Sequence, residues 1–373
     1  MTNSLLTQSG GTLKRALKDN QEAFTGQDFY IGIDVHQKQW TISVQSNQMA
    51  LAKPLTVDPS AGSLSRYLQR QYPGGKYHAV YEAGYSGFWP ARDLFTHEID
   101  TIVVNPADIP TMHKERSTKT DSVDSRKLAR SLENKELRAI YIPERKAEEY
   151  RLLNRYRSQL VRDETRIKNR IKAILAEFNY RVPVELEGNR WSGAYLQWLQ
   201  KVNFETPYAQ IAYNERLEQL AESRKRLAKV LRELKLMATQ EPSIGSLVKL
   251  LQTVPGVGFL TAILFVVELI DMHRFKRFDE LVSYIGLAPS VHQSDERSYS
   301  GGLTKRQHHE LRSRLLESAW IAVRKDPVLT LKYGQLCKRM NKNKAIIRIA
   351  KMLVSRIRTV WKTQTPYVYG VIE

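Results

Sequence analysis

The sequence predicts a mixed α/β domain followed by two mainly helical regions. Between Asp28 and Ile142, short runs of β-branched and aromatic residues alternate with runs of helical spacing. From residue 146 to 178, leucine and isoleucine recur every seven residues, which is typical of long packed helices. The end of the chain is helical in pattern and strongly basic. We divide the chain into an N-terminal extension (1–27), an α/β domain (28–145), a helical arm (146–240) and a C-terminal domain (241–373).

The α/β domain is expected to begin with a β-hairpin. Its first segment is apolar and β-branched, and its second alternates as a half-buried strand does. Helices and strands then alternate, separated by Pro and Gly residues. The expected elements are, in order, strands 29–34 and 40–44, helix 60–71, strand 77–81, helix 89–97, strand 101–104 and helix 122–132. Antiparallel strands followed by β–α alternation indicate a mixed sheet with helices on both faces.

Two heptad patterns define the arm. The first contains Leu153, Leu160, Ile167 and Ile174, and the second contains Leu220, Leu227 and Leu234. Arg157 and Glu164 interrupt the first pattern, and a segment rich in Trp, Pro and Gly separates the two. The spacing predicts an antiparallel coiled-coil arm or a dimerisation helix pair. The alternative is two helices that pack on their own domain.

The C-terminal domain contains two segments of interest. Pro255–Gly258 lies between two apolar helical segments and resembles the turn of a helix-hairpin-helix, whose backbone N–H groups can hold a phosphate; a plain helix–helix turn is the alternative. Residues 286–305 are rich in Ser and Gly and are expected to form a loop. A hydroxyl held there among cations and near a metal ion could attack a phosphodiester.

The charge distribution points to a polyanionic partner. The chain has 58 basic and 39 acidic side chains, a net charge of +19. Residues 301–373 contribute 16 basic and only 4 acidic side chains, so nucleic acid is expected to bind there. Such contacts to the nucleic-acid backbone position the protein without reading sequence. The expected contact residues are Lys305, Arg306, Arg312, Arg314, Lys338, Arg339, Lys342 and Lys344.

Composition excludes several other classes of protein. The single cysteine, Cys337, cannot form an internal disulfide, so we expect a cytoplasmic protein. The apolar run 259–267 is too short to span a bilayer, and no membrane partner is expected. The sequence has no nucleotide-binding P-loop and no Gly-x-Ser-x-Gly elbow. The histidines lack the spacing of zinc ligands, and His308 and His309 are expected to face phosphate or solvent.

Four acidic residues are placed where a metal site could form. Asp34 and Glu82 end two predicted strands, and Asp121 and Asp124 lie three residues apart on one face of a predicted helix. Clustered carboxylates repel one another, and Mg²⁺ with its preference for oxygen ligands would offset that repulsion. Two such ions can stabilise the attacking and leaving oxygens of a phosphoryl displacement. The alternative is structural: Asp121 as a helix N-cap, Asp124 as a first-turn charge, and Asp34 as strand-end polarity.

Taken together, these segments resemble the DEDD-type insertion-sequence transposases, the insertion sequence 110 family that includes the Piv-type DNA invertases. The resemblance runs from about residue 28 to 320 in the order of the family. The matching segments are 32–36, 81–83, 105–106, 120–125, 255–258, 286–290 and 293–294.

The resemblance implies a RuvC-like (RNase H-like) domain in which Asp34, Glu82, Asp121 and Asp124 bind Mg²⁺. It further implies a coiled-coil arm and a C-terminal transposase domain with Ser294 as the nucleophile. In the family this serine forms a transient phosphoserine link to DNA, and acids and serine come from different protomers of a tetramer assembled from dimers. A structured non-coding RNA, the bridge RNA, pairs with donor and target DNA.

This chain departs from the family pattern beside the serine. Asp295 stands where the family has Gly, and Gln307-His308 replaces a common Gly-Asn pair. Ser290 and Ser298 are therefore alternative nucleophiles. We expect an RNA-guided recombinase for insertion-sequence excision and integration. The alternatives are a RuvC-like, metal-dependent, structure-specific endonuclease that acts by hydrolysis without a serine, and a nucleic-acid-binding protein without catalytic activity.

Overall fold

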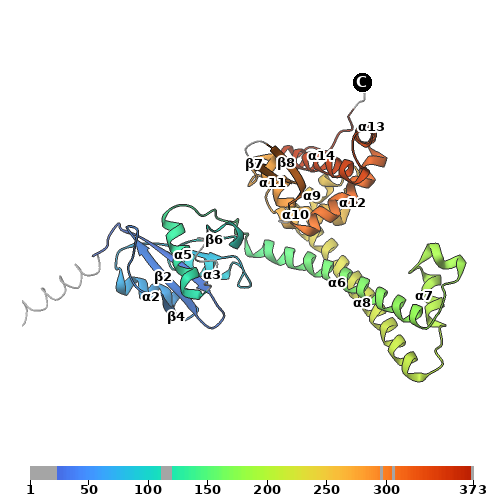
Figure 1. Ribbon diagram of the computed structural model, residues 1–373, viewed down its shortest axis with the longest axis horizontal. Helices are drawn as coiled ribbons and strands as arrows, with labels where there is room; N and C mark the ends of the chain where they lie inside the picture. Colours follow the sequence, from blue (N-terminus) through green and yellow to red (C-terminus); the bar gives the residue numbers. More distant parts are fainter. Residues whose placement is uncertain (1–22, 111–119, 295–296, 305–306, 371–373) are drawn as a thin grey trace, which may run out of the picture. The chain divides into compact units, whose positions relative to one another are not determined.

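The computed structural model describes residues 23–110, 120–294, 297–304 and 307–370. The chain divides into two compact units, with the boundary between Ile142 and Pro143 (Figure 1). Among the described helices, none combines the length and the apolar composition that a membrane span requires. The predicted boundaries of arm and C-terminal domain stay predictions.

The N-terminal unit contains a mixed sheet with the strand order β3-β2-β1-β5-β6, and β4 also pairs with β2. β1 is antiparallel to β2 and parallel to β5, and β5 is parallel to β6. The strands are β1 (Asp28–Val35), β2 (Trp40–Ser46), β3 (Met49–Ala50), β4 (Leu55–Val57), β5 (Lys76–Glu82) and β6 (Asp100–Val104). The predicted hairpin and mixed sheet are confirmed. β3 and β4 were not predicted, because two or three residues are too few to show a period.

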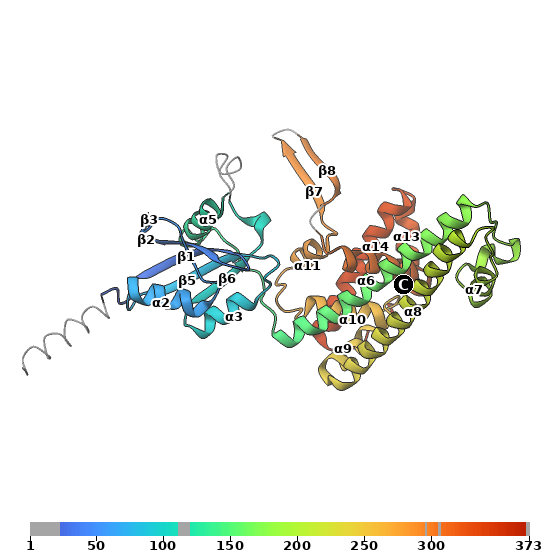
Figure 2. The same ribbon diagram turned by 90° about the horizontal axis from the view of Figure 1, so that it is seen from below.

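Helices cover both faces of this sheet, as predicted (Figure 2). They are α2 (Ala61–Gln71), α3 (Trp89–Thr96) and α5 (Asp121–Glu133), with the short helix η1 (Pro106–Asp108) after β6. On β1, Ile31 and Ile33 share a core with α2 and α3. Gly32 between them faces α5, as expected for side chains that alternate along a strand.

Gly32 permits the close approach of α5 to the sheet. A Cβ atom at this position would lie 2.0 Å from the carbonyl oxygen of Ser125 and 2.5 Å from the backbone nitrogen of Ala129. The Ser125 hydroxyl also forms a 2.8 Å hydrogen bond with the Ser43 hydroxyl of β2. The side chain missing at Gly32 therefore fixes the distance between β1 and the helix that bears two of the four acids.

We expect Gly32→Ala to destabilise the N-terminal unit by about 3 kcal/mol, the upper end of the usual range for overpacking, because the added methyl group overlaps α5 backbone atoms. Hydrogen exchange followed by mass spectrometry should show faster exchange in β1 and α5. Gly62→Ala in α2 is the control: its Cβ would meet only His97 Nε2, at 3.4 Å, and alanine favours a helix. Unchanged exchange in the Gly32 variant would contradict this packing.

The second unit begins with two long helices, α6 (Arg145–Glu177) and α8 (Pro207–Gln240). They are antiparallel, because Lys146 pairs with Glu241 (2.7 Å) while Glu164 pairs with Arg224 (3.4 Å). The predicted antiparallel pair is thus confirmed, and Figure 2 shows the two helices side by side. Both interruptions of the heptad pattern are buried: Glu164 pairs with Arg224 of α8, whereas Arg157 lies near Glu310 and Arg314 of α12.

The two ends of this helix pair belong to different cores. At the far end, Ile171 packs with Tyr195 and Tyr213, near the elements that join the long helices: η2 (Val184–Asn189) and α7 (Gly193–Gln200). At the near end, Leu160 and Leu234 share one core with the C-terminal helices. The pair therefore projects as an arm at one end and packs on its own unit at the other.

The C-terminal helices surround the second core. They are α9 (Pro242–Leu251), α10 (Phe259–Leu269), α11 (Phe278–Ile285), α12 (His309–Lys325), α13 (Pro327–Cys337) and α14 (Lys342–Thr363). In the turn between α9 and α10, Gly256 has φ +83°, and a Cβ there would lie 2.2 Å from the Ser318 carbonyl oxygen of α12. The left-handed backbone and the close packing against α12 thus require glycine at position 256.

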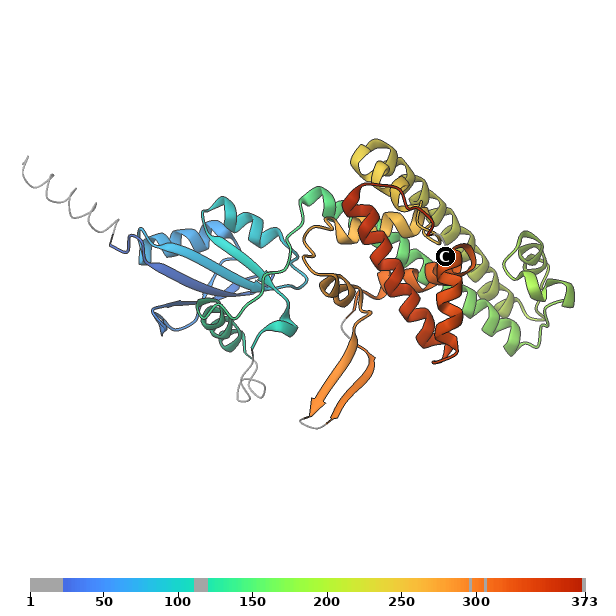
Figure 3. The ribbon, with the colours of Figure 1, turned by 90° about the horizontal axis from the view of Figure 1, so that it is seen from above.

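The expected loop at 286–305 is instead largely a β-hairpin. β7 (Pro289–Ser294) pairs antiparallel with β8 (Arg297–Leu303), and Figure 3 shows the hairpin projecting from the helices of its unit. The loop prediction was wrong because Ser and Gly, although common in loops, do not exclude a paired strand.

A buried carboxylate ties the arm to the C-terminal helices. Glu268 on α10 is fully buried and accepts two 2.8 Å hydrogen bonds from Arg155. Arg151 lies 3.2 Å away and His308 Nε2 3.1 Å away. Because His308 Nδ1 accepts the N–H of Leu311 as the cap of α12, an Nε2–H tautomer satisfies both contacts. The prediction that His308 faces phosphate or solvent was therefore wrong.

Burial raises the pKa of Glu268, but the hydrogen bonds from His308 and Arg155 outweigh it and lower the pKa from 4.5 to about 2. The carboxylate therefore stabilises the fold above about pH 4.5, and this contribution, about 3 kcal/mol, is lost as the pH falls toward 2. Urea unfolding followed by circular dichroism at several pH values should show this loss.

Glu268→Gln should remove that part of the pH dependence. At pH 7 it should lower the free energy of unfolding by about 3–5 kcal/mol, since two arginines lose their partner. Glu222→Gln, at a half-exposed ion pair with Arg226, is the matched control and should change little. An unchanged pH profile in the Glu268 variant would contradict the assignment.

Candidate active site

The four predicted acids gather at one end of the N-terminal sheet. Ile33 of β1 pairs with Tyr81 of the parallel strand β5, and the next residues along the two strands are Asp34 and Glu82. Asp121 and Asp124 lie in the first turn of α5, which packs on both strands. Carboxylates are favourable there because the N-terminus of a helix carries partial positive charge.

The cap of α5 is Thr120, whose hydroxyl accepts a hydrogen bond from the Val123 N–H. Asp121 follows as the first helical residue, so the alternative that Asp121 is the N-cap was wrong. A threonine cap leaves the Asp121 carboxylate available for other contacts.

Asp34, Asp121 and His36 form one half of the site. One possible ligand atom from each of the three lies within 4.8 Å of the other two. His36 Nε2 is 3.3 Å from Asp34 Oδ2 and 3.7 Å from Asp121 Oδ2. The imidazole therefore lies between two carboxylates from different elements.

Glu82 and Asp124 form the other half, around Lys127. The ammonium nitrogen of Lys127 is 3.1 Å from Asp124 Oδ1 and 3.7 Å from Glu82 Oε1. The Lys127 side chain is only 9% exposed, and it lies one helical turn after Asp124. The structure thus arranges the four acids as two pairs, each with a basic side chain between its members.

Electrostatics at Asp34 favour a bound cation. Burial raises the pKa of Asp34, His36 lowers it, and Asp121 and Asp124 raise it further, so the net shift is upward. An ion among these groups would reverse the repulsion that opposes ionisation. Two carboxylates and an imidazole within ligand distance of one another form a donor set that fits a divalent metal.

Neither basic residue of this site was predicted from the sequence. His36 follows Asp34 by two positions, a spacing that places two side chains on the same side of an extended strand. Lys127 follows Asp124 by three positions on a helix, which also places them on one face. Spacing relative to the acids would have found both.

The candidate serine lies in the other unit. Ser294 is the last residue of β7 and pairs with Arg297 at the start of β8. Ser290 and Ser298, the alternatives, lie on the same hairpin, and Ser298 pairs with Gln293. Asp295 falls outside the described residues. The backbone thus places all three serines on one hairpin, with Ser294 nearest its turn.

The predicted basic contacts fall into three groups. Lys305 and Arg306 lie outside the described residues. Arg312 and Arg314 are partly buried; Arg312 donates to the Gly286 carbonyl (3.4 Å), and Arg314 pairs with Glu317 (2.9 Å). The exposed group lies around the end of α13 and the start of α14 and consists of Lys338, Arg339, Lys342 and Lys344.

Comparison with known proteins matches both units. Residues 31–180 match the sequence model of the DEDD transposases of the IS110 type, and residues 248–334 match that of the transposase IS116/IS110/IS902 family. The chain belongs to the IS110 family of transposases. The first match contains Asp34, Glu82, Asp121 and Asp124, and the second contains Ser294. Membership of this family makes the chain a DNA transposase.

Individual relatives agree with this assignment. Protein y4qE of Sinorhizobium fredii, named as a transposase, is 29% identical over 97% of this chain and 85% of its own length. The transposase of insertion sequence element IS1533 from Leptospira borgpetersenii is 24% identical over 78% of this chain and 84% of its own. The IS1111A transposase of Coxiella burnetii is 24% identical over 73% and 74%, respectively.

Lys127→Met tests whether the buried ammonium of Lys127 takes the place of a metal ion between Asp124 and Glu82. The variant should lose about 1–3 kcal/mol of stability in chelator, because Asp124 and Glu82 lose their positive neighbour. Mg²⁺ should then raise its melting temperature more than that of the unmodified protein. Arg126→Met, an exposed residue of the same helix, is the control. Equal Mg²⁺ shifts in all three proteins would contradict this role.

Proposed function

We propose that this transposase cuts and rejoins DNA with a Mg²⁺ site on the N-terminal unit and a serine nucleophile on the C-terminal hairpin. The observation that carries the proposal is the convergence of Asp34, Asp121 and His36 within ligand distance of one another. Glu82 and Asp124 adjoin this cluster through Lys127.

The strand arrangement supports an RNase H-like fold for the N-terminal unit. An antiparallel hairpin is followed by two strands parallel to β1, and helices cover both faces. In the RuvC-like domains that the family resemblance implies, acids at strand ends and on a final helix hold the metal. Asp34, Glu82 and the first turn of α5 occupy such places here.

Asp34 and Asp121 would hold the ion, and Glu82 and Asp124 would complete its oxygen ligands once Lys127 moves aside. When bound, Mg²⁺ neutralises charge on the scissile phosphate and polarises it. His36 lies within 3.3 Å of Asp34 and orients that carboxylate. The protein thus supplies a rigid frame for the reacting phosphate.

In the proposed chemistry, the Ser294 hydroxyl attacks the phosphorus, and a serine–phosphorus ester bond forms as one phosphodiester bond of the DNA breaks. The released sugar hydroxyl takes up the proton that the serine gives up. Attack by another sugar hydroxyl reverses the step, so rejoining needs no ATP. We further propose that acids and serine come from different protomers of a tetramer built from dimers.

Sequence selection would come from an RNA. Lys338, Arg339, Lys342 and Lys344 are exposed and would contact nucleic-acid backbone, which positions a duplex without reading its bases. A bridge RNA that pairs with donor and target DNA would supply specificity, as base pairing does in other guided systems. This part of the proposal rests on the family resemblance.

A second candidate is a RuvC-like endonuclease that cleaves with water. The acids lie together in one unit, and the candidate serine lies in the other. This separation favours a reaction that needs the acids alone. The two proposals differ in one product, because only the serine reaction leaves a covalent link between protein and DNA.

Strand cleavage with DNA containing the ends of the element, its flanking RNA transcript and Mg²⁺ separates these alternatives. Asp34→Asn should slow cleavage at least about 100-fold, since the charge at the phosphate is then less well offset. Ser294→Ala should abolish the protein–DNA species seen on a denaturing gel.

Ser290→Ala and Ser298→Ala are the matched controls on the same hairpin and should retain that species. Undiminished cleavage by Ser294→Ala with no covalent species would favour the endonuclease. Full cleavage by Asp34→Asn would contradict the metal site.

A further inference from the structure

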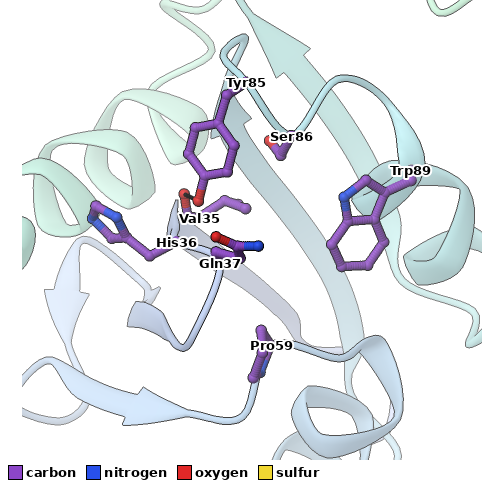
Figure 4. A pocket seen from close by; sticks show the side chains of 7 residues that line it. All are labelled: Val35, His36, Gln37, Pro59, Tyr85, Ser86 and Trp89. Atoms are coloured by element: carbon purple, nitrogen blue, oxygen red, sulfur yellow. Dashed lines mark hydrogen bonds between the residues drawn. The ribbon is translucent and has the colours of Figure 1, made fainter.

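A pocket of about 310 Å³ lies beside the acid cluster. Its walls come from the turn after β1, the segment before α2, and the loop between β5 and α3 (Figure 4). The lining residues are Val35, His36, Gln37, Pro59, Tyr85, Ser86 and Trp89. The pocket has no role in the chemistry proposed above.

Two aromatic side chains in the pocket are unusually accessible. Tyr85 is 72% exposed and Trp89 is 47% exposed. Both are nonetheless held: Tyr85 donates a hydrogen bond to the Val35 carbonyl (3.2 Å), and Trp89 packs on the fully buried Trp40 with ring centroids 5.8 Å apart. The pocket therefore presents aromatic surface in a fixed position, which suits a planar ligand.

The pocket and the acid cluster share one residue, His36. In Figure 4 the imidazole of His36 points away from the other lining side chains. It contacts Asp34 and Asp121, while the same residue contributes to the pocket wall. A nucleotide whose phosphate is bound at the acids would therefore place its sugar and base near the pocket.

The polar groups of the pocket fit the hydrogen-bonding edge of an uncharged heteroaromatic ring. No lining residue is a lysine or arginine, so a phosphate would find no permanent positive charge. Gln37 offers both amide donors and an acceptor, and Figure 4 shows its amide among the lining side chains. These groups match a nucleobase, which stacks by its face and forms hydrogen bonds at its edge.

We propose that this pocket receives one unpaired nucleobase of the DNA strand whose phosphate lies at the acid cluster. The inference rests on the proposed function, because strand exchange must separate base pairs beside the cut. Stacking against Tyr85 and Trp89 would offset the cost of unstacking that base. Gln37 would contribute preference among bases.

The test uses the full chain and a single-stranded DNA of about 15 nucleotides in which 5-iodouracil replaces thymine. Near-ultraviolet light joins this base to an aromatic ring in contact with it, and mass spectrometry locates the bond. We expect adducts on Tyr85 or Trp89. Tyr85→Ala should lose its adduct and bind the DNA about 5- to 100-fold more weakly.

Tyr85→Phe should keep most of the affinity that Tyr85→Ala loses, because it retains the stacking surface although it loses the hydrogen bond to the Val35 carbonyl. Phe95→Ala is the matched control: Phe95 lies on the same helix as Trp89, is 46% exposed and does not line the pocket. Trp89→Leu provides a second variant that keeps an apolar contact with Trp40.

Adducts confined to other surfaces, with unchanged affinity of the Tyr85 and Trp89 variants, would overturn the pocket proposal. That result would leave the proposed function standing, since cleavage that depends on Asp34 is measured separately. Conversely, pocket adducts together with full cleavage by Asp34→Asn would support base binding and contradict the metal site.

Discussion

Repulsion between carboxylates is the constraint on which the N-terminal unit depends. Four acids gather at one end of a sheet, and each pair of them has a basic side chain between its members. His36 lies between Asp34 and Asp121, and Lys127 lies between Glu82 and Asp124. The fold therefore offsets the repulsion among these acids by placing a positive or neutral partner within each pair.

The rest of the unit serves to hold these groups in position. A glycine on β1 lets α5 approach the sheet, and the parallel pairing of β1 with β5 brings two strand ends together.

In the second unit, Glu268 connects α6, α10 and the start of α12 through buried charged contacts. Because α12 follows β8 of the hairpin that bears Ser294, this network supports the end of the hairpin where β8 leads into α12.

The fold could be predicted from the sequence where periodicity was strong. The β1–β2 hairpin, the parallel strands and the two long helices all follow from apolar spacing. Side chains whose partners are distant in sequence could not be predicted. The burial of Glu164 depends on Arg224 of the opposing helix, and the burial of Arg157 depends on α12. The burial of His308 depends on Glu268, forty residues earlier. The acids were predicted because two end strands and two lie in the first turn of a helix. The basic residues between them were not predicted, because their role depends on acids from other elements.

Binding of Mn²⁺ as a substitute for Mg²⁺, followed by electron paramagnetic resonance, tests the central claim most directly. The account predicts that the full chain immobilises Mn²⁺ and that Asp121→Asn loses most of this binding, while Asp93→Asn, on α3 and away from the cluster, retains it. Equal Mn²⁺ binding by the Asp121 variant and the unmodified chain would contradict a metal site at the end of this sheet.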